Sequence, residues 1–326
     1  MADIYPWQQA LWSQLRPRPA RPRLSALASA GIGKRALAEH WAAQLLTRAC
    51  AAGACGECKA CQLLAAGTHP DYFVLEPEEA EKPIRVDQVR DLVGFVVQTA
   101  QLGGRKVVLL EPAEAMNVNA ANALLKSLEE PSGDTVLLLI SHQPSRLLPT
   151  IKSRCVQQAC PLPGAAASLE WLAPGLPDEP AEALEELLAL SGGSPLTAQR
   201  LHGQGAGEQR AQVVEGVKKL LKQQIAASPL AESWNRVPIA IALRLVLRLT
   251  LGILRYQLTH DEEGLGLADM RKVIQYLGDK SGHRKVLAMQ DWLLQQRQKV
   301  LNKANLNRVL LLEALLVQWG SLPGPG

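Results

Sequence analysis

The sequence predicts an α/β domain built on a parallel sheet, followed by a long all-helical region. Three observations lead to this prediction: short segments rich in Val, Leu and Ile, amphipathic helical segments between them, and a Leu-rich sequence without strand patterns after residue 164. Short continuous apolar runs are typical of strands buried on both faces of a parallel sheet. Their alternation with helices implies right-handed crossovers.

The first domain is expected to contain four strands, at residues 24–28, 72–75, 107–111 and 135–141. Helical periodicity fills the intervals between them. Apolar residues recur every fourth position from Leu37 to Leu45, and they form one face of residues 86–97. A third helix is predicted over 119–130, where Pro131 ends it.

Length and composition indicate the number of domains. The 326 residues are 47% hydrophobic and 20% charged, which excludes a largely disordered chain and suits two or three domains. Pro161–Gly164 interrupts the alternation of strand and helix, and the glycine-rich residues 202–207 predict a linker. We therefore expect domains at 1–162, 163–206 and 207–326.

Charge and hydropathy exclude several classes of protein. The net charge of +4 is too small for a protein that coats nucleic acid by charge alone. No apolar run reaches the ~18 residues of a membrane span, so no membrane partner is expected. The first residues lack the apolar centre of a secretory signal. A cytoplasmic location, where thiols stay reduced, is the expectation.

Four cysteines, Cys50, Cys55, Cys58 and Cys61, fall within twelve residues. Clustered thiols in a reducing compartment are more often metal ligands than disulfides. Four thiolates satisfy the tetrahedral preference of Zn²⁺ and leave no open position, so a structural zinc ion is favoured over a catalytic one. An iron–sulfur cluster and four unrelated thiols remain the alternatives.

A segment that resembles a phosphate loop follows the first predicted strand. The pattern GxxxxGK[ST] is matched at Gly31, Gly33 and Lys34, whereas Ala28 replaces its first glycine. Arg35 stands where a Ser or Thr hydroxyl would hold Mg²⁺. Backbone N–H groups at a helix N-terminus can still cradle phosphate, but efficient hydrolysis is not expected.

The strand predicted at 107–111 also departs from the sequence pattern of ATP-hydrolysing proteins. In ATP-hydrolysing relatives of such loops, this strand ends in an Asp that serves Mg²⁺ and is followed by a catalytic Glu. Here Glu111 takes the first position and Pro112 the second. Because proline has no group that could orient water, the two motifs agree in predicting lost hydrolysis.

Three further segments complete a resemblance to a known family: Asn122–Pro131, Ser153–Cys155 and Gly67–Asp71. With the cysteine insert and the altered phosphate loop, they resemble the delta prime family of clamp-loader subunits of bacterial DNA polymerase III, a branch of the AAA+ proteins. The resemblance is strong over 1–162, moderate as far as Pro195, and weak over 208–326, where it rests on length and helicity.

The resemblance implies a RecA-like AAA+ core with a zinc-knuckle insert at about 50–61, then a helical lid and an all-α collar that mediates oligomerisation. Implied partners are the paralogous clamp-loader ATPase subunits and the clamp-opening delta subunit, and indirectly the sliding clamp and primer–template DNA, in a nucleoid-associated replisome. Such a subunit of the DNA polymerase holoenzyme serves as a stator during ATP-dependent clamp loading. Weak or no ATP binding is expected of the chain itself.

The resemblance also assigns roles to individual residues. Arg154 matches the arginine finger that acts on a neighbour's nucleotide, Lys34 matches the phosphate-loop lysine, and the four cysteines match the zinc ligands. Leu196 lies where an ATPase paralogue carries a sensor arginine, and the sensor threonine position falls at Ser141 or His142. For Arg154, a salt bridge to Glu129 or Glu130 is the structural alternative.

Two other functions compete with this interpretation. The chain could be an active ATPase motor with a divergent phosphate loop, which Arg35 and Pro112 disfavour. It could instead be a zinc-ribbon module for nucleic acid fused to an inactive nucleotide fold. That function requires basic and aromatic residues beside the cysteines, but Glu57 and Lys59 are the charges that the knuckle offers.

Overall fold

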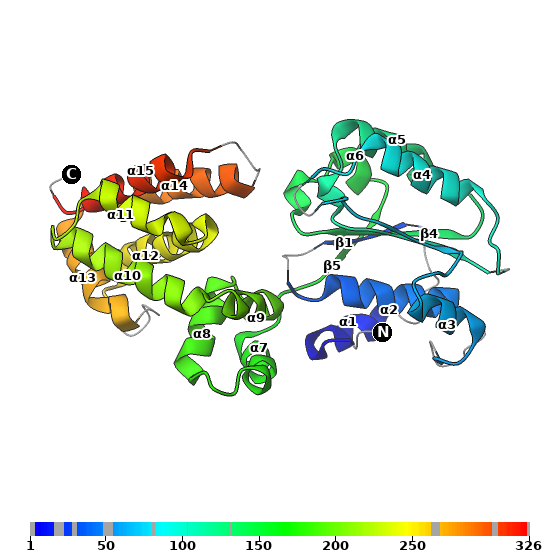
Figure 1. The fold of residues 1–326 in the computed structure, drawn as a ribbon, viewed down its shortest axis with the longest axis horizontal. Helices are drawn as coiled ribbons and strands as arrows, with labels where there is room; N and C mark the ends of the chain where they lie inside the picture. Colours follow the sequence, from blue (N-terminus) through cyan, green and yellow to red (C-terminus); the bar gives the residue numbers. More distant parts are fainter. Residues whose placement is uncertain are drawn as a thin grey trace. The chain divides into compact units, whose positions relative to one another are not determined.

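The computed structural model (Figure 1) describes most of the chain, namely residues 4–15, 23–27, 31–47, 55–79, 82–102, 104–130, 132–261, 268–301 and 306–324. The chain divides into two compact units. The first comprises Met1–Trp171 with Gly193–Thr197, and the second comprises Leu172–Gly192 with Ala198–Gly326. Each unit has its own core and is described separately.

The first unit is built on a five-stranded parallel sheet in the order β2-β3-β4-β1-β5. Its strands are β1 (Arg23–Leu27), β2 (Tyr72–Leu75), β3 (Lys106–Leu110), β4 (Thr135–Ser141) and β5 (Val156–Ala159). The four predicted strands are confirmed within one residue. The sequence analysis missed β5, because this edge strand is polar and largely exposed and so lacks the apolar run of a central strand.

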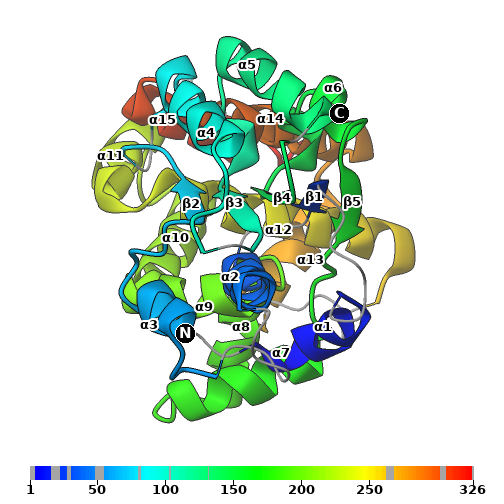
Figure 2. The ribbon, with the colours of Figure 1, turned by 90° about the vertical axis from the view of Figure 1, so that its right-hand side faces the viewer.

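Helices cover both faces of this sheet (Figures 1 and 2). On one face, α4 (Val86–Val97), α5 (Val118–Glu129) and α6 (Pro149–Lys152) contribute to a core with alternate side chains of β3 and β4, such as Val108 and Leu137. On the other face, α1 (Gln9–Leu15) and α2 (Lys34–Leu46) pack on the intervening side chains, such as Leu109 and Leu138. The fully buried side chains of β3 and β4 explain their continuous apolar sequence.

Short helical segments complete the first unit. They are α3 (Lys59–Ala65), most of α7 (Ala165–Leu172), and 3-10 turns at Pro6–Gln8, Ala113–Ala115 and Pro144–Arg146. The predicted helix at 119–130 is confirmed as α5, which Asn117 caps by accepting the N–H of Ala120 at 2.8 Å. An amide oxygen at this position satisfies one of the free N–H groups of the first turn.

The second unit is helical, and its described residues contain no strand. Its helices are α8 (Ala181–Leu190), most of α9 (Pro195–Gly203), α10 (Ala206–Leu221), α11 (Ala227–Ser233), α12 (Ile239–Thr259), α13 (Arg271–Lys280), α14 (His283–Leu301) and α15 (Arg308–Gly320), with 3-10 turns at Ala173–Gly175, Trp234–Arg236 and Ala268–Met270. Helix α12 packs against α13 and α14, and α11 packs against α15. Trp234 and Trp319 are fully buried in this unit.

The prediction of a linker at residues 202–207 is wrong. Helix α9 continues to Gly203 and α10 begins at Ala206, so only two residues separate them. Gly205 has a φ of +72° at the N-cap of α10. The glycines therefore permit a sharp turn between two helices, where the composition had suggested an extended connection.

Asp71, in the segment before β2, fixes the loop that leads from α4 to β3. Its carboxylate is buried and accepts the backbone N–H groups of Gln101 at 2.7 Å and Leu102 at 2.9 Å. Its own carbonyl oxygen accepts the N–H of Val107 at 2.9 Å. This residue thereby joins the starts of two neighbouring strands.

Replacing Asp71 with Ala should lower the free energy of unfolding by about 2 kcal/mol or more, because two backbone donors lose a charged partner. Urea unfolding followed by circular dichroism measures this loss. The matched control is Asp91→Ala on α4, where the side chain is exposed. Equal unfolding midpoints for the two variants would contradict the role of Asp71 in fixing the loop between α4 and β3.

Candidate functional site

The phosphate-loop segment leads directly into α2, as the sequence predicts. Gly31 and Gly33 have φ values of +76° and +81°, a conformation that favours glycine, and Gly33 is the N-cap of the helix that starts at Lys34. Ala28 lies outside the described residues. The described part of the loop is therefore a glycine turn that leads into the N-terminus of a helix.

The first turn of α9 lies directly against Gly31. The carbonyl oxygen of Gly31 accepts a hydrogen bond from the Ser194 hydroxyl at 2.8 Å and from the Leu196 N–H at 3.2 Å. A Cβ atom at Gly31 would lie 2.0 Å from the Thr197 hydroxyl oxygen and 2.3 Å from that of Ser194. Glycine is therefore required at this position by close packing as well as by its φ value.

Residues of the N-terminal segment, which precedes β1, contact the loop. The Trp7 indole N–H and the Gln8 side-chain amide both donate to the carbonyl oxygen of Ile32, at 3.0 and 2.8 Å. A Cβ atom at Gly33 would lie 2.3 Å from the ring of Tyr5. Tyr5 and Trp7 stack with centroids 5.0 Å apart, and Trp171 meets both rings edge-on. Side chains of the N-terminal segment thus contact Ile32 and Gly33, in the described part of the loop.

Lys34 is almost completely buried, with 3% of its surface exposed. Desolvation lowers the pKa of its ammonium group to about 8, although Cys160, Glu111 and Glu114 each act to raise it. A lysine that binds phosphate gains from a nearby anion, whereas this one lies in a protein interior that disfavours its charge. Its surroundings are therefore more enclosed than those of an open phosphate site.

Arg35, which stands where a Ser or Thr would bind magnesium, forms ion pairs with carboxylates. Its guanidinium contacts Glu76 at 2.7 Å, Glu39 at 2.8 Å and Glu111 at 3.6 Å. Hydrogen bonds to Glu76 and Glu39 raise the pKa of Arg35 further. Burial raises the pKa of the Glu111 carboxyl, while Arg35 and Lys34 act to lower it. A side-chain cation thus faces the acid at the end of β3.

The residues after β3 and β4 form a second polar cluster beside the loop. One carboxylate oxygen of Glu114 accepts the backbone N–H groups of His142 at 2.9 Å and Gln143 at 3.0 Å. The Nε2 atom of His142 lies 3.4 Å from Glu111. Desolvation and the charge of Lys34 lower the pKa of His142, which favours its neutral form. Of the two candidate sensor positions, Ser141 is fully buried and His142 contacts Glu111.

Arg154 lies just beyond α6 and is held by α5. Its Nε donates to Glu129 at 2.7 Å, a second guanidinium nitrogen also contacts Glu129, and Nη1 donates to the carbonyl of Thr150 at 3.0 Å. The side chain is 31% exposed. The salt bridge considered as an alternative is therefore present in the single chain, and a role in trans stays a prediction.

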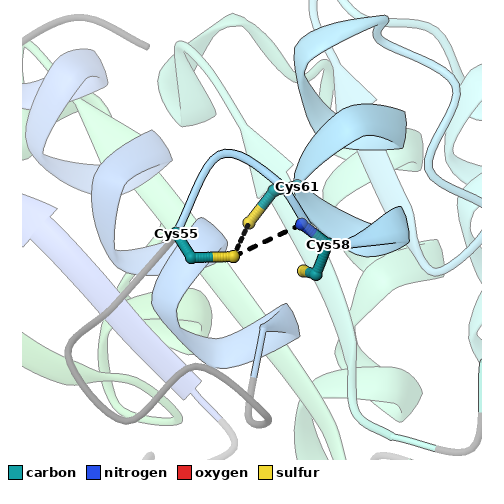
Figure 3. Close-up of side chains that lie close together, drawn as sticks. All are labelled: Cys55, Cys58 and Cys61. Atoms are coloured by element: carbon teal, nitrogen blue, oxygen red, sulfur yellow. Dashed lines mark hydrogen bonds between the residues drawn. The ribbon is translucent and has the colours of Figure 1, made fainter.

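Three of the four predicted metal ligands lie together (Figure 3), while Cys50 falls outside the described residues. The Sγ atoms of Cys55, Cys58 and Cys61 all lie within 4.8 Å of one another, with 3.9 Å between Cys55 and Cys61. Zn–S bonds of about 2.3 Å in a tetrahedron place sulfurs about 3.8 Å apart. The N–H of Cys58 also donates to the Cys55 sulfur at 3.3 Å. These three thiols therefore fit a tetrahedral metal ion.

The pKa of Cys61 is raised mainly by burial, and its thiol neighbours raise it further. Bringing three thiolates together is unfavourable without a cation, which a metal ion would supply. The other two described cysteines, Cys155 and Cys160, are buried.

The sequence analysis did not assign Tyr5, Trp7, Ser194 or Thr197 to the site. They lie far from the phosphate loop in sequence and belong to no spacing pattern, so no sequence signal links them to it. The nearest signal was Gly193–Pro195, a segment noted for its resemblance to clamp-loader subunits.

The sheet order, the glycine turn before α2 and the arginine after the last apolar strand define the class of protein: an AAA+ domain followed by a helical region. The family model for the DNA polymerase III delta subunit matches residues 21–161, and the model for its C-terminal part matches residues 204–321. A DNA polymerase III subunit delta' from Pseudomonas aeruginosa is 89% identical over the full length of both chains.

More distant relatives agree with this match. Subunits of the same name from Yersinia pestis and Escherichia coli are 36% and 32% identical, over 81% and 83% of this chain and 78% and 80% of theirs. The chain belongs to the family of DNA polymerase III delta' subunits. Among the described helices, none combines the length and the apolar character that a membrane crossing requires.

Proposed function

We propose that this chain is a non-hydrolysing clamp-loader subunit that acts as a stator while its partners load the sliding clamp onto primed DNA. The observation that carries the proposal is the close packing around the described part of the phosphate-loop segment. Ser194 and Thr197 lie against Gly31, and Tyr5 lies against Gly33. The Ser194 hydroxyl also donates to the Gly31 carbonyl oxygen, so side chains of the chain itself hold this turn.

The charged groups beside the loop support the same proposal. Phosphoryl transfer depends on a magnesium ion that neutralises developing charge and on a group that orients the nucleophile. Arg35 takes the position of the Ser or Thr that would bind magnesium, and it pairs with Glu39 and Glu76. Pro112 takes the position of the catalytic glutamate that would orient water. An active ATPase motor would need both the magnesium ligand and the group that orients the nucleophile, and this chain has neither at the expected positions.

Arg154 is proposed to act on the nucleotide of a neighbouring ATPase subunit. A planar, permanently charged guanidinium is suited to γ-phosphate oxygens. The contacts to Glu129 and to the Thr150 carbonyl would keep the side chain extended from the end of α6 before assembly. Glu129 is then a positioning residue for this arginine.

The remaining parts of the proposal concern the metal and the partners. Cys50, Cys55, Cys58 and Cys61 would hold one structural zinc ion that ties down the segment before α3. The partners would be the paralogous ATPase subunits and the delta subunit, in the cytoplasm, with 1–162 as the core, 163–206 as the lid and 207–326 as the collar.

The test of the central proposal is nucleotide turnover by the isolated chain. We expect no multiple-turnover ATP hydrolysis and weak or no binding of a fluorescent ATP analogue. Arg35→Thr should not restore hydrolysis, because Pro112 still supplies no group that could orient water. Hydrolysis that disappears in Lys34→Ala would establish the motor function instead.

The role of Arg154 is tested in the reconstituted complex with wild-type partners. Arg154→Ala should assemble normally, whereas hydrolysis at the nucleotide site it faces should fall by about 10³-fold or more, the contribution of an arginine finger. Arg154→Lys should substitute poorly. DNA- and clamp-stimulated ATPase and clamp loading are the measurements.

Two controls separate this role from a structural one. Arg90→Ala removes an exposed arginine of the same unit and should leave the stimulated ATPase unchanged. Glu129→Gln weakens the positioning contact and should give a smaller loss of ATPase than Arg154→Ala, with an unchanged melting temperature. Undiminished stimulated ATPase in the Arg154→Ala complex would leave a structural salt bridge as the role of Arg154.

Metal analysis of chain purified without added metal should give one zinc ion per chain. Cys58→Ser should reduce the zinc content and lower thermal stability, since metal binding contributes folding free energy. Cys155→Ala, which removes a cysteine outside the cluster, should retain the zinc. A wild-type chain with free thiols and no zinc would contradict the proposal.

A further inference from the structure

Glu114 lies in the 3-10 turn after β3 and fixes the backbone of the segment that follows β4. One of its carboxylate oxygens accepts two successive backbone N–H groups, from His142 at 2.9 Å and from Gln143 at 3.0 Å. Hydrogen bonds from backbone N–H groups to an ionised carboxylate are stronger than those between neutral groups. A single acid therefore holds the chain at the point where it leaves the sheet.

The segment that begins at these two bonds leads to Arg154. A 3-10 turn at Pro144–Arg146 and the short helix α6 lie between β4 and this arginine. The turn and the helix are joined, because the ammonium group of Lys152 donates to the carbonyl oxygen of Pro144 at 3.2 Å. The turn and the helix are thus linked to each other as well as to the strand.

Apolar packing holds the middle of the same segment. Leu147 and Ile151 are buried in the core that α4 and α5 form with the sheet. Glu114 holds the beginning of the segment, and the bond from Arg154 to Glu129 holds its end. Because a close-packed interior transmits strain, a displacement at the beginning of this segment is passed on toward Arg154.

The lysine of the phosphate loop lies in the electrostatic surroundings of Glu114. Lys34 is buried, and while desolvation lowers its pKa, the negative charge of Glu114 is among those that act to raise it. The second carboxylate oxygen of Glu114 is buried and accepts no hydrogen bond from a described residue. A buried carboxylate is stable in its ionised form when a cation is near. Lys34 supplies that cation from within the chain.

We propose that Glu114 is a positioning residue for Arg154. It holds the segment after β4 in the arrangement that presents the guanidinium to the nucleotide of a neighbouring ATPase subunit, and Lys34 stabilises its ionised form. Glu114 acts through the backbone of this segment and not by contact with the neighbour's nucleotide. The inference rests on the function proposed above for Arg154, and it adds a remote support to the local one from Glu129.

The test uses the reconstituted complex with wild-type partners. In Glu114→Ala, the DNA- and clamp-stimulated kcat should fall by about tenfold or more, because a misplacement of about 1 Å can cost about 10²-fold. The KM for ATP should stay the same, since the lost interaction is one made in the transition state. Glu114→Gln keeps an oxygen that can accept both N–H groups, so its loss of kcat should be smaller.

A double variant separates positioning from an independent effect. When Arg154→Ala is already present, Glu114→Ala should cause little further loss of kcat, because residues that act as a unit have non-additive effects. Losses that multiply in the double variant would show that Glu114 acts by another route, and would overturn the proposal.

The matched control is Asp71→Ala. Asp71 also accepts two backbone N–H groups, but they belong to the loop between α4 and β3. This variant should therefore lose stability while its complex keeps the stimulated kcat of the wild type. Melting temperatures and gel filtration verify that each variant folds and assembles. If Glu114→Ala does not fold, Glu114→Gln is compared with Asp71→Asn in the same assays.

Three further results would overturn the proposal, and they differ in what they leave standing. An unchanged kcat in Glu114→Ala beside a large loss in Arg154→Ala would refute the positioning role alone. Equal losses in Glu114→Ala and Asp71→Ala would assign the effect to stability. An unchanged kcat in Arg154→Ala itself would contradict the function proposed for that arginine, and the role of Glu114 with it.

Discussion

Distant segments of the first unit donate hydrogen bonds to the carbonyl oxygens of Gly31 and Ile32, and the turn before α2 depends on these bonds. Gly31 accepts Ser194 and Leu196, and Ile32 accepts Trp7 and Gln8. Two segments nearly 190 residues apart in sequence are thereby joined at one turn. Because buried carbonyls need partners, these contacts stabilise the loop without any ligand.

The same region shows how charge can be balanced without a metal ion. In an ATP-hydrolysing loop, a hydroxyl and an acid hold magnesium beside the phosphates. Here the guanidinium of Arg35 lies between Glu39, Glu76 and Glu111, so the cation is part of the side-chain network. A fixed guanidinium of this kind stabilises the ionised carboxylates beside it. Unlike a bound magnesium ion, it has no coordination position that a phosphate oxygen could occupy.

Other groups of the chain are exposed to solvent. The guanidinium of Arg154 is partly exposed, and Leu251 and Leu258 on α12 leave apolar surface in water. Exposed apolar side chains are typical of interaction surfaces where they cluster. Such groups suit a protein that acts together with partners.

The sequence by itself determined the parallel sheet, the helix after the phosphate loop and the grouping of the cysteines, because buried strands, glycine turns and CxxC spacing are local patterns. It did not determine β5, whose polar residues are ordered by pairing with β1, nor the turn at Gly205, where composition suggested a linker. Only the tertiary structure showed that Tyr5 lies against Gly33, that Thr197 lies against Gly31, and that Arg154 pairs with Glu129. These contacts join residues distant in sequence, and no periodicity records such proximity.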